Sequence, residues 1–161
     1  MSKELGDWGE ATAAQLLTKR GYQVDHLGGN YPVVDLLISG ASPFRVSVKT
    51  SASKQHVRLG TEKSVSNLRD DDFVMAFLPR GKEPLDLADA VYRLLILPGN
   101  VARDDALCVH RNYLAFSRSD GAGRTGNAGI IVKGYSRRLD QVETWKRWLT
   151  FEDRWDLLPA P

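Results

Sequence analysis

The chain has one cysteine among its 161 residues, and it lacks long apolar runs. A single cysteine, Cys108, excludes an internal disulfide and any zinc site built from several cysteines, and it favours a reducing compartment. The longest apolar runs, 33–38 and 94–97, are far shorter than the roughly 20 residues that span a bilayer. No apolar stretch near the N-terminus resembles a signal peptide. We therefore expect a soluble, cytoplasmic protein that does not enter membranes.

The chain also lacks a strong charge of either sign. Its 22 lysines and arginines face 20 aspartates and glutamates, so the formal net charge is +2. This balance excludes a strongly basic nucleic-acid coat, although a local basic cleft remains compatible with it. A length of 161 residues with 42% hydrophobic side chains predicts a single domain, 1–161, with a sizeable core.

Several motifs that would carry other chemistries are missing. The chain has neither a G-x-x-x-x-G-K-[ST] phosphate loop nor a G-x-S-x-G elbow. A G-x-G-x-x-G pattern at 121–126 precedes an apolar strand instead of the helix that would bind a dinucleotide phosphate. His26, His56 and His110 lack the spacing of metal ligands, so we expect them on the surface or in packing roles.

Hydrophobic periodicity predicts a chain of alternating helices and strands. A first helix is expected at 3–20, capped by Ser2 and ended by Gly21. Strands are expected at 22–27, 33–39, 44–51, 72–79, 90–97, 113–117 and 130–133, and helices at 64–68, 100–110 (capped by Asn100) and 138–158. Most of 52–71 is expected to be a polar loop, a candidate for phosphate contact, and 117–129 a flexible one. The tryptophans of the tail are expected to be core and packing residues and not a base-stacking platform.

The least ordinary stretch is 33–51, which predicts a hairpin with a turn at 40–43. Asp35 lies inside an otherwise apolar strand, and Lys49 lies in the next strand. Because strand side chains alternate between faces, Ser47 and Lys49 share one face. A carboxylate and an ammonium close to a core predict either a structural ion pair or an active site, and the pattern leaves both open.

Glu10 is a second carboxylate of interest. It precedes Ala13, Ala14 and Leu17 at helical spacing, so it lies on or at the edge of the face that the first helix buries. It is either a rim residue with its head group in water or a carboxylate directed to the same place as Asp35.

Four short motifs in this region resemble the PD-(D/E)xK nuclease superfamily, closest to its Holliday-junction-resolvase-like branch. They are GEATA at 9–13, GYQV at 21–24, DLL at 35–37 and SVKTS at 47–51, and the closing FEDRWDLL at 151–158 is similar to the end of some members. The resemblance implies an α/β, restriction-endonuclease-like three-layer core. Its central mixed β-sheet would be flanked by the N-terminal helix and the tryptophan-bearing tail.

The resemblance also implies a metal-dependent phosphodiester hydrolase, an endonuclease that acts on DNA with Mg²⁺ or Mn²⁺. Asp35 would then be a metal ligand and Glu10 a second one. Lys49 would orient or deprotonate the attacking water, or neutralise the phosphate. The implied partner is nucleic acid, with DNA ahead of RNA, and cleavage of both strands of a duplex would favour a homodimer.

Ser47 departs from the family, which has Glu, Asp or Gln at this catalytic position. A hydroxyl is a weaker ligand for a divalent metal than a carboxylate. The alternative is therefore a catalytically inactive nuclease-like domain that binds nucleic acid or a protein partner. A third reading keeps Asp35 and Lys49 as a structural ion pair without any site.

Overall fold

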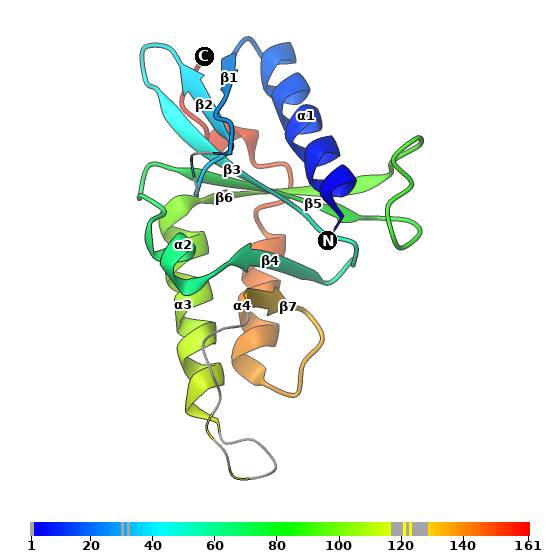
Figure 1. Cartoon of the computed structure of the whole chain (residues 1–161), viewed down its shortest axis with the longest axis vertical. Helices are drawn as coiled ribbons and strands as arrows, with labels where there is room; N and C mark the ends of the chain where they lie inside the picture. Colours follow the sequence, from blue (N-terminus) through cyan, green and yellow to red (C-terminus); the bar gives the residue numbers. More distant parts are fainter. Residues whose placement is uncertain (1, 30, 32, 117–120, 122, 124–128) are drawn as a thin grey trace.

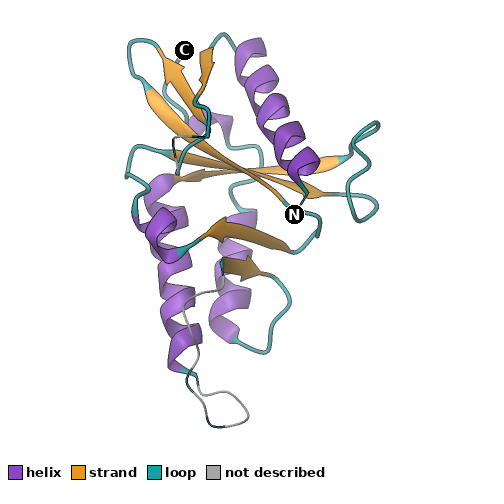
Figure 2. Ribbon diagram, viewed as in Figure 1, coloured by secondary structure: helices purple, strands orange, loops and turns teal. Residues whose placement is uncertain are grey.

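A five-stranded mixed sheet forms the centre of the computed structural model, which describes residues 2–29, 31, 33–116, 121, 123 and 129–161 (Figure 1, Figure 2). Its strands, in spatial order, are β1 (Gln23–His26), β2 (Leu36–Ser39), β3 (Phe44–Thr50), β5 (Phe73–Pro79) and β6 (Tyr92–Pro98). Strands β3 and β5 are parallel, and the other neighbours are antiparallel. With helices on both sides of this sheet, the expected architecture is confirmed.

Helix α1 (Lys3–Lys19) covers one face of the sheet. The Ser2 hydroxyl accepts a hydrogen bond from the Leu5 N–H, and Gly21 follows the helix with φ +91°, so the expected caps are confirmed. Ala13 and Leu17 of α1 pack onto the apolar residues of β2, β3 and β5. The ring of Trp8 contacts two core aromatic rings edge to face.

The other face is covered by three helices and a second, two-stranded sheet. The helices are α2 (Glu62–Ser66), α3 (Gly99–Ala115) and α4 (Leu139–Leu149), and the small sheet pairs β4 (His56–Gly60) with β7 (Ile130–Lys133). Trp145 and Trp148 are 5% and 0% exposed within this second core, as expected for packing residues. None of the helices within the described residues is long and apolar enough to cross a membrane.

Strand β4 corrects the prediction that most of 52–71 is an irregular loop. Its alternation of buried and exposed residues covers only five positions, and the charge of the outward ones conceals it in the sequence. The expected strand at 33–39 is shorter than predicted and begins at Leu36. The short helix expected at 64–68 is found slightly earlier, as α2.

Helix α3 also differs from the prediction. It continues to Ala115, so the strand expected at 113–117 is wrong for the residues that the structure describes. Asn100 is not its cap, because the helix begins at Gly99 directly after β6. The Gly99 N–H instead donates to the Asp72 carbonyl over 2.6 Å. Most of 117–129, with most of the G-x-G-x-x-G letters, lies outside the described residues.

The tail is not one helix. It consists of α4 and a short 3-10 helix, η1 (Trp155–Leu157), separated by a turn in which Glu152 forms an isolated antiparallel bridge with Leu95 of β6. In this segment the Phe151 carbonyl accepts from the Ile96 N–H, and the Asp153 N–H donates to the Leu94 carbonyl. A turn that is hydrogen-bonded to β6 therefore interrupts the predicted helix. Leu139, one of the apolar residues of the predicted helix, is 70% exposed.

Candidate active site

Asp35 lies at the edge of the pairing between β2 and β3. Its N–H donates to the Val46 carbonyl over 2.9 Å, immediately before β2 begins. Farther along β3, the Val48 N–H donates to the carboxylate oxygen Oδ2 of Asp35 over 2.6 Å. The side chain thus satisfies a backbone donor that would otherwise need a carbonyl from the neighbouring strand. This bond holds the Asp35 carboxylate beside the final third of β3.

Glu10 reaches the same region because α1 crosses β3 very closely. A Cβ atom added to Gly9 would lie 1.9 Å from the Thr50 hydroxyl oxygen, so only glycine permits this approach. The next residue, Glu10, is half-buried. Burial and then the charge of Asp35 raise the pKa of the Glu10 carboxyl, which places the two carboxylates within electrostatic range of each other.

Lys49 also lies within electrostatic range of both carboxylates. Burial raises the pKa of Asp35, while the Val48 N–H and then the positive charge of Lys49 act in the opposite direction. Lys49 likewise opposes the raised pKa of Glu10. Within the described part of the chain, however, no carboxylate oxygen lies within 4.0 Å of the Lys49 nitrogen. The structure therefore groups these charges without forming a direct Asp35–Lys49 ion pair.

Ser47 is 1% exposed and lies beside a small cavity of about 100 Å³. Lys49 lines the same cavity, together with Leu59 and Gly60 of β4 and residues of α2. The two β3 residues thus share a face, as the strand alternation predicts.

The donor set restricts which metal this region could hold. Among the residues that the structure describes, no group of three or more His, Cys, Asp or Glu side chains is arranged to hold a metal ion. Asp35 and Glu10 supply two carboxylates, whose pKa values are raised mainly by burial, and a nearby cation would stabilise their charged forms. Mg²⁺ often binds through one or two carboxylates and completes its shell with water and substrate phosphate. The residues fit such an open site and not a closed cage.

Sequence analysis did not assign His26 to this region. It pairs with Leu36 in the β1–β2 register, one position from Asp35, and its charge lowers the pKa of Glu10. Its sequence position at the end of the strand that precedes the Asp35 strand is the only signal that could have suggested this placement.

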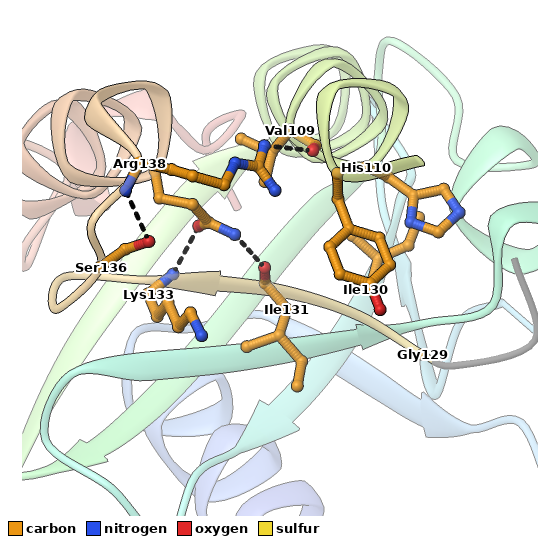
Figure 3. A pocket seen from close by; sticks show the side chains of 10 residues that line it. Val109, His110, Gly129, Ile130, Ile131, Lys133, Ser136 and Arg138 are labelled. Carbon is orange, nitrogen blue, oxygen red and sulfur yellow. Dashed lines mark hydrogen bonds between the residues drawn. The ribbon is translucent and has the colours of Figure 1, made fainter. Parts of the chain in front are cut away.

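A larger cavity of about 340 Å³ lies elsewhere, between α3, α4 and β7, and contains none of the predicted site residues (Figure 3). Its polar side chains mainly join these three elements. The Gln141 amide accepts from the Lys133 N–H and donates to the Ile131 carbonyl, and Arg138 donates to the Val109 carbonyl. These bonds give the polar lining a structural role.

No family model matches the chain, and no curated protein matches it. Among solved structures, it is similar to Hjc, a Holliday junction resolvase from Archaeoglobus fulgidus. The two are 14% identical over 78% of this chain and 83% of that chain, with a TM-score of 0.41. At this identity and TM-score the likeness is distant.

Proposed function

We propose that the protein is a metal-dependent phosphodiester hydrolase, an endonuclease that acts on DNA. One observation carries the proposal: Glu10 of α1, Lys49 of β3 and Asp35, just before β2, lie together near the final third of β3, and Lys49 makes no ion pair within the described residues. Two carboxylates and an ammonium in one half-buried place serve the needs of phosphodiester hydrolysis. The four sequence motifs around them support the same chemistry.

The two carboxylates have the role of binding a hard divalent cation, Mg²⁺ or Mn²⁺. When bound, such a cation would stabilise negative charge on the reacting phosphate and increase the acidity of a bound water. Asp35 is positioned for this role by the Val48 N–H, which holds Oδ2 and restricts the side-chain rotamers. Glu10 is positioned by the close contact of Gly9 with β3.

Lys49 has the role of contacting substrate. Its ammonium group makes no ion pair within the described residues, so its hydrogen-bond donors remain available to a phosphate oxygen or to the attacking water. In the first case it neutralises phosphate charge, and in the second it orients the water or accepts its proton.

Cleavage assays with plasmid, single-stranded DNA and RNA test this proposal, with Mg²⁺ and with Mn²⁺. We expect the wild type to cleave DNA and Lys49→Ala to lose at least about 100-fold in rate, the scale of a lost acid–base or charge-stabilising group. Lys19→Ala is the matched control, because Lys19 is exposed on α1 and should leave the rate unchanged. Full activity in Lys49→Ala would refute its role, and preferential RNA cleavage would change the substrate.

A second candidate is a catalytically inactive module that binds nucleic acid or a protein. The buried Ser47 hydroxyl favours it, because the described site then has two carboxylates and not three. Ser47→Glu separates the candidates, since the adjoining cavity can receive part of the longer side chain. A weak enzyme should gain metal affinity and rate, whereas an inactive module should gain no turnover.

A further inference from the structure

The small β4–β7 sheet turns a cationic face away from the core. Along both strands, buried apolar residues alternate with more exposed ones. The buried set is Val57, Leu59, Ile130 and Val132. The positions between them carry His56 and Arg58 on β4 and Lys133 on β7. Alternation therefore directs the basic side chains to one face of this sheet.

Strand register brings these basic groups together. His56 lies directly opposite Lys133, and Arg58 lies opposite Ile131. Figure 3 shows the side chains of Ile131 and Lys133 extending from β7 on the side away from α3 and α4. After burial, the charges of Arg58 and Lys133 lower the pKa of His56, and Glu83, on the loop between β5 and β6, opposes them. The cations are thus close enough to repel one another.

Arg58 and Lys133 are not neutralised by any carboxylate among the described residues. In the described part of the chain neither residue forms an ion pair, although the ammonium of Lys133 lies 5.6 Å from the centre of the Tyr135 ring. The arginines of β6 and α4 differ, because Arg93 and Arg147 each lie within 4.0 Å of a carboxylate. A face of mutually repelling cations, without ion-pair partners among the described residues, is complementary to a polyanion.

The strand that carries His56 and Arg58 ends beside the candidate active site. Leu59 and Gly60, at this end of β4, line the same cavity as Lys49. From Gly60 back to His56 the strand extends about 13 Å, which corresponds to about four base-pair steps along the axis of a DNA duplex. One nucleic-acid strand could therefore contact Lys49 and the cationic face at the same time.

We propose that His56, Arg58 and Lys133 bind backbone phosphates of the nucleic acid whose reacting phosphate lies at Lys49. The proposal rests on the proposed function and names the surface that holds its substrate. Contacts with phosphate position a nucleic acid without reading its sequence. We therefore expect binding along this face to be independent of sequence and sensitive to salt.

Fluorescence anisotropy with a labelled DNA duplex over a range of salt concentrations tests this surface. The test variant is Arg58→Gln with Lys133→Gln, which retains most of each aliphatic stem. The control is Lys19→Gln with Lys146→Gln, which removes the same charge from exposed positions on α1 and α4. We expect at least about tenfold weaker binding in the test variant only, and a log–log salt slope shallower by about two.

The outcomes separate this inference from the proposed function. Equal weakening in both variants, or no change in either, would overturn the phosphate surface while wild-type cleavage still supported the nuclease. Salt-dependent wild-type binding that only the test variant loses would support the surface even if no cleavage were found. A folded wild type that neither binds nor cleaves DNA would overturn both.

Discussion

The basic residues at the two ends of strand β3 differ in whether they form an ion pair. At its beginning, Arg45 donates two hydrogen bonds to Asp72, over 2.8 Å and 2.6 Å. Asp72 is 1% exposed and also accepts from the Arg69 N–H. Near its end, Lys49 makes no ion pair within the described residues, although Asp35 and Glu10 lie within electrostatic range.

This difference separates a structural pair from a candidate site. The hydrogen bond with Asp72 raises the pKa of Arg45, so the fold stabilises that charge. Burial raises the pKa values of Asp35 and Glu10, so the fold penalises their charges. Satisfied charges are typical of structural ion pairs, whereas penalised charges are typical of functional sites. This contrast supports a structural role for the beginning of β3 and a functional role for its end.

Removing one member of the structural pair should have the largest effect on stability. Asp72→Ala leaves the partly buried Arg45 guanidinium and the Arg69 N–H without an acceptor. We expect a loss of about 3 kcal/mol in the free energy of unfolding, measured by denaturant titration. Lys49→Ala is the comparison and should cost less than about 1 kcal/mol. Similar losses in both variants would show that Lys49 also belongs to a structural pair.

Two substitutions of Asp35 should separate its structural role from its charge. Asp35→Asn retains an oxygen that can accept the Val48 N–H, whereas Asp35→Ala leaves this donor unpaired. We expect Asp35→Ala to be less stable than Asp35→Asn by about 1–3 kcal/mol. Both should lack metal-dependent cleavage, measured beside the wild type. Cleavage retained in Asp35→Asn would contradict a role for the carboxylate charge.

The smallest effect should be a change of stability with pH. The pKa values of Glu10 and Asp35 are raised in the fold, so their contribution to stability is present at acidic pH, below their unfolded values near 4. It is lost as pH rises through the raised values. The melting temperature of the double variant Glu10→Gln, Asp35→Asn should therefore increase relative to wild type as pH rises toward neutrality.

Adding Mg²⁺ to the same two proteins tests whether these carboxylates bind the cation. At neutral pH the cation should raise the melting temperature of the wild type, because it binds the folded carboxylates, and leave the double variant unchanged. At a concentration ten times the dissociation constant, the gain would be about 1.4 kcal/mol. A Mg²⁺ effect equal in both proteins would place the binding site elsewhere.

Much of the fold could be predicted because its signals are local. Ser2 and Gly21 cap α1 through neighbours a few residues away, and the apolar runs of β5 and β6 need no distant information. Strand β4 escaped prediction because it is short and its outward residues are charged. The tail escaped because pairing of Phe151 with β6 overrides helical propensity.

The sequence by itself determined which face of β3 each of its polar residues occupies. Alternation put Arg45, Ser47 and Lys49 on one face, because it depends on the backbone alone. Only the tertiary structure decided the partners. In the folded chain Arg45 donates to Asp72, 27 positions away. The Val48 N–H donates to the carboxylate of Asp35, 13 positions away. Pairing of charges depends on distances between segments remote in sequence, which local periodicity does not contain.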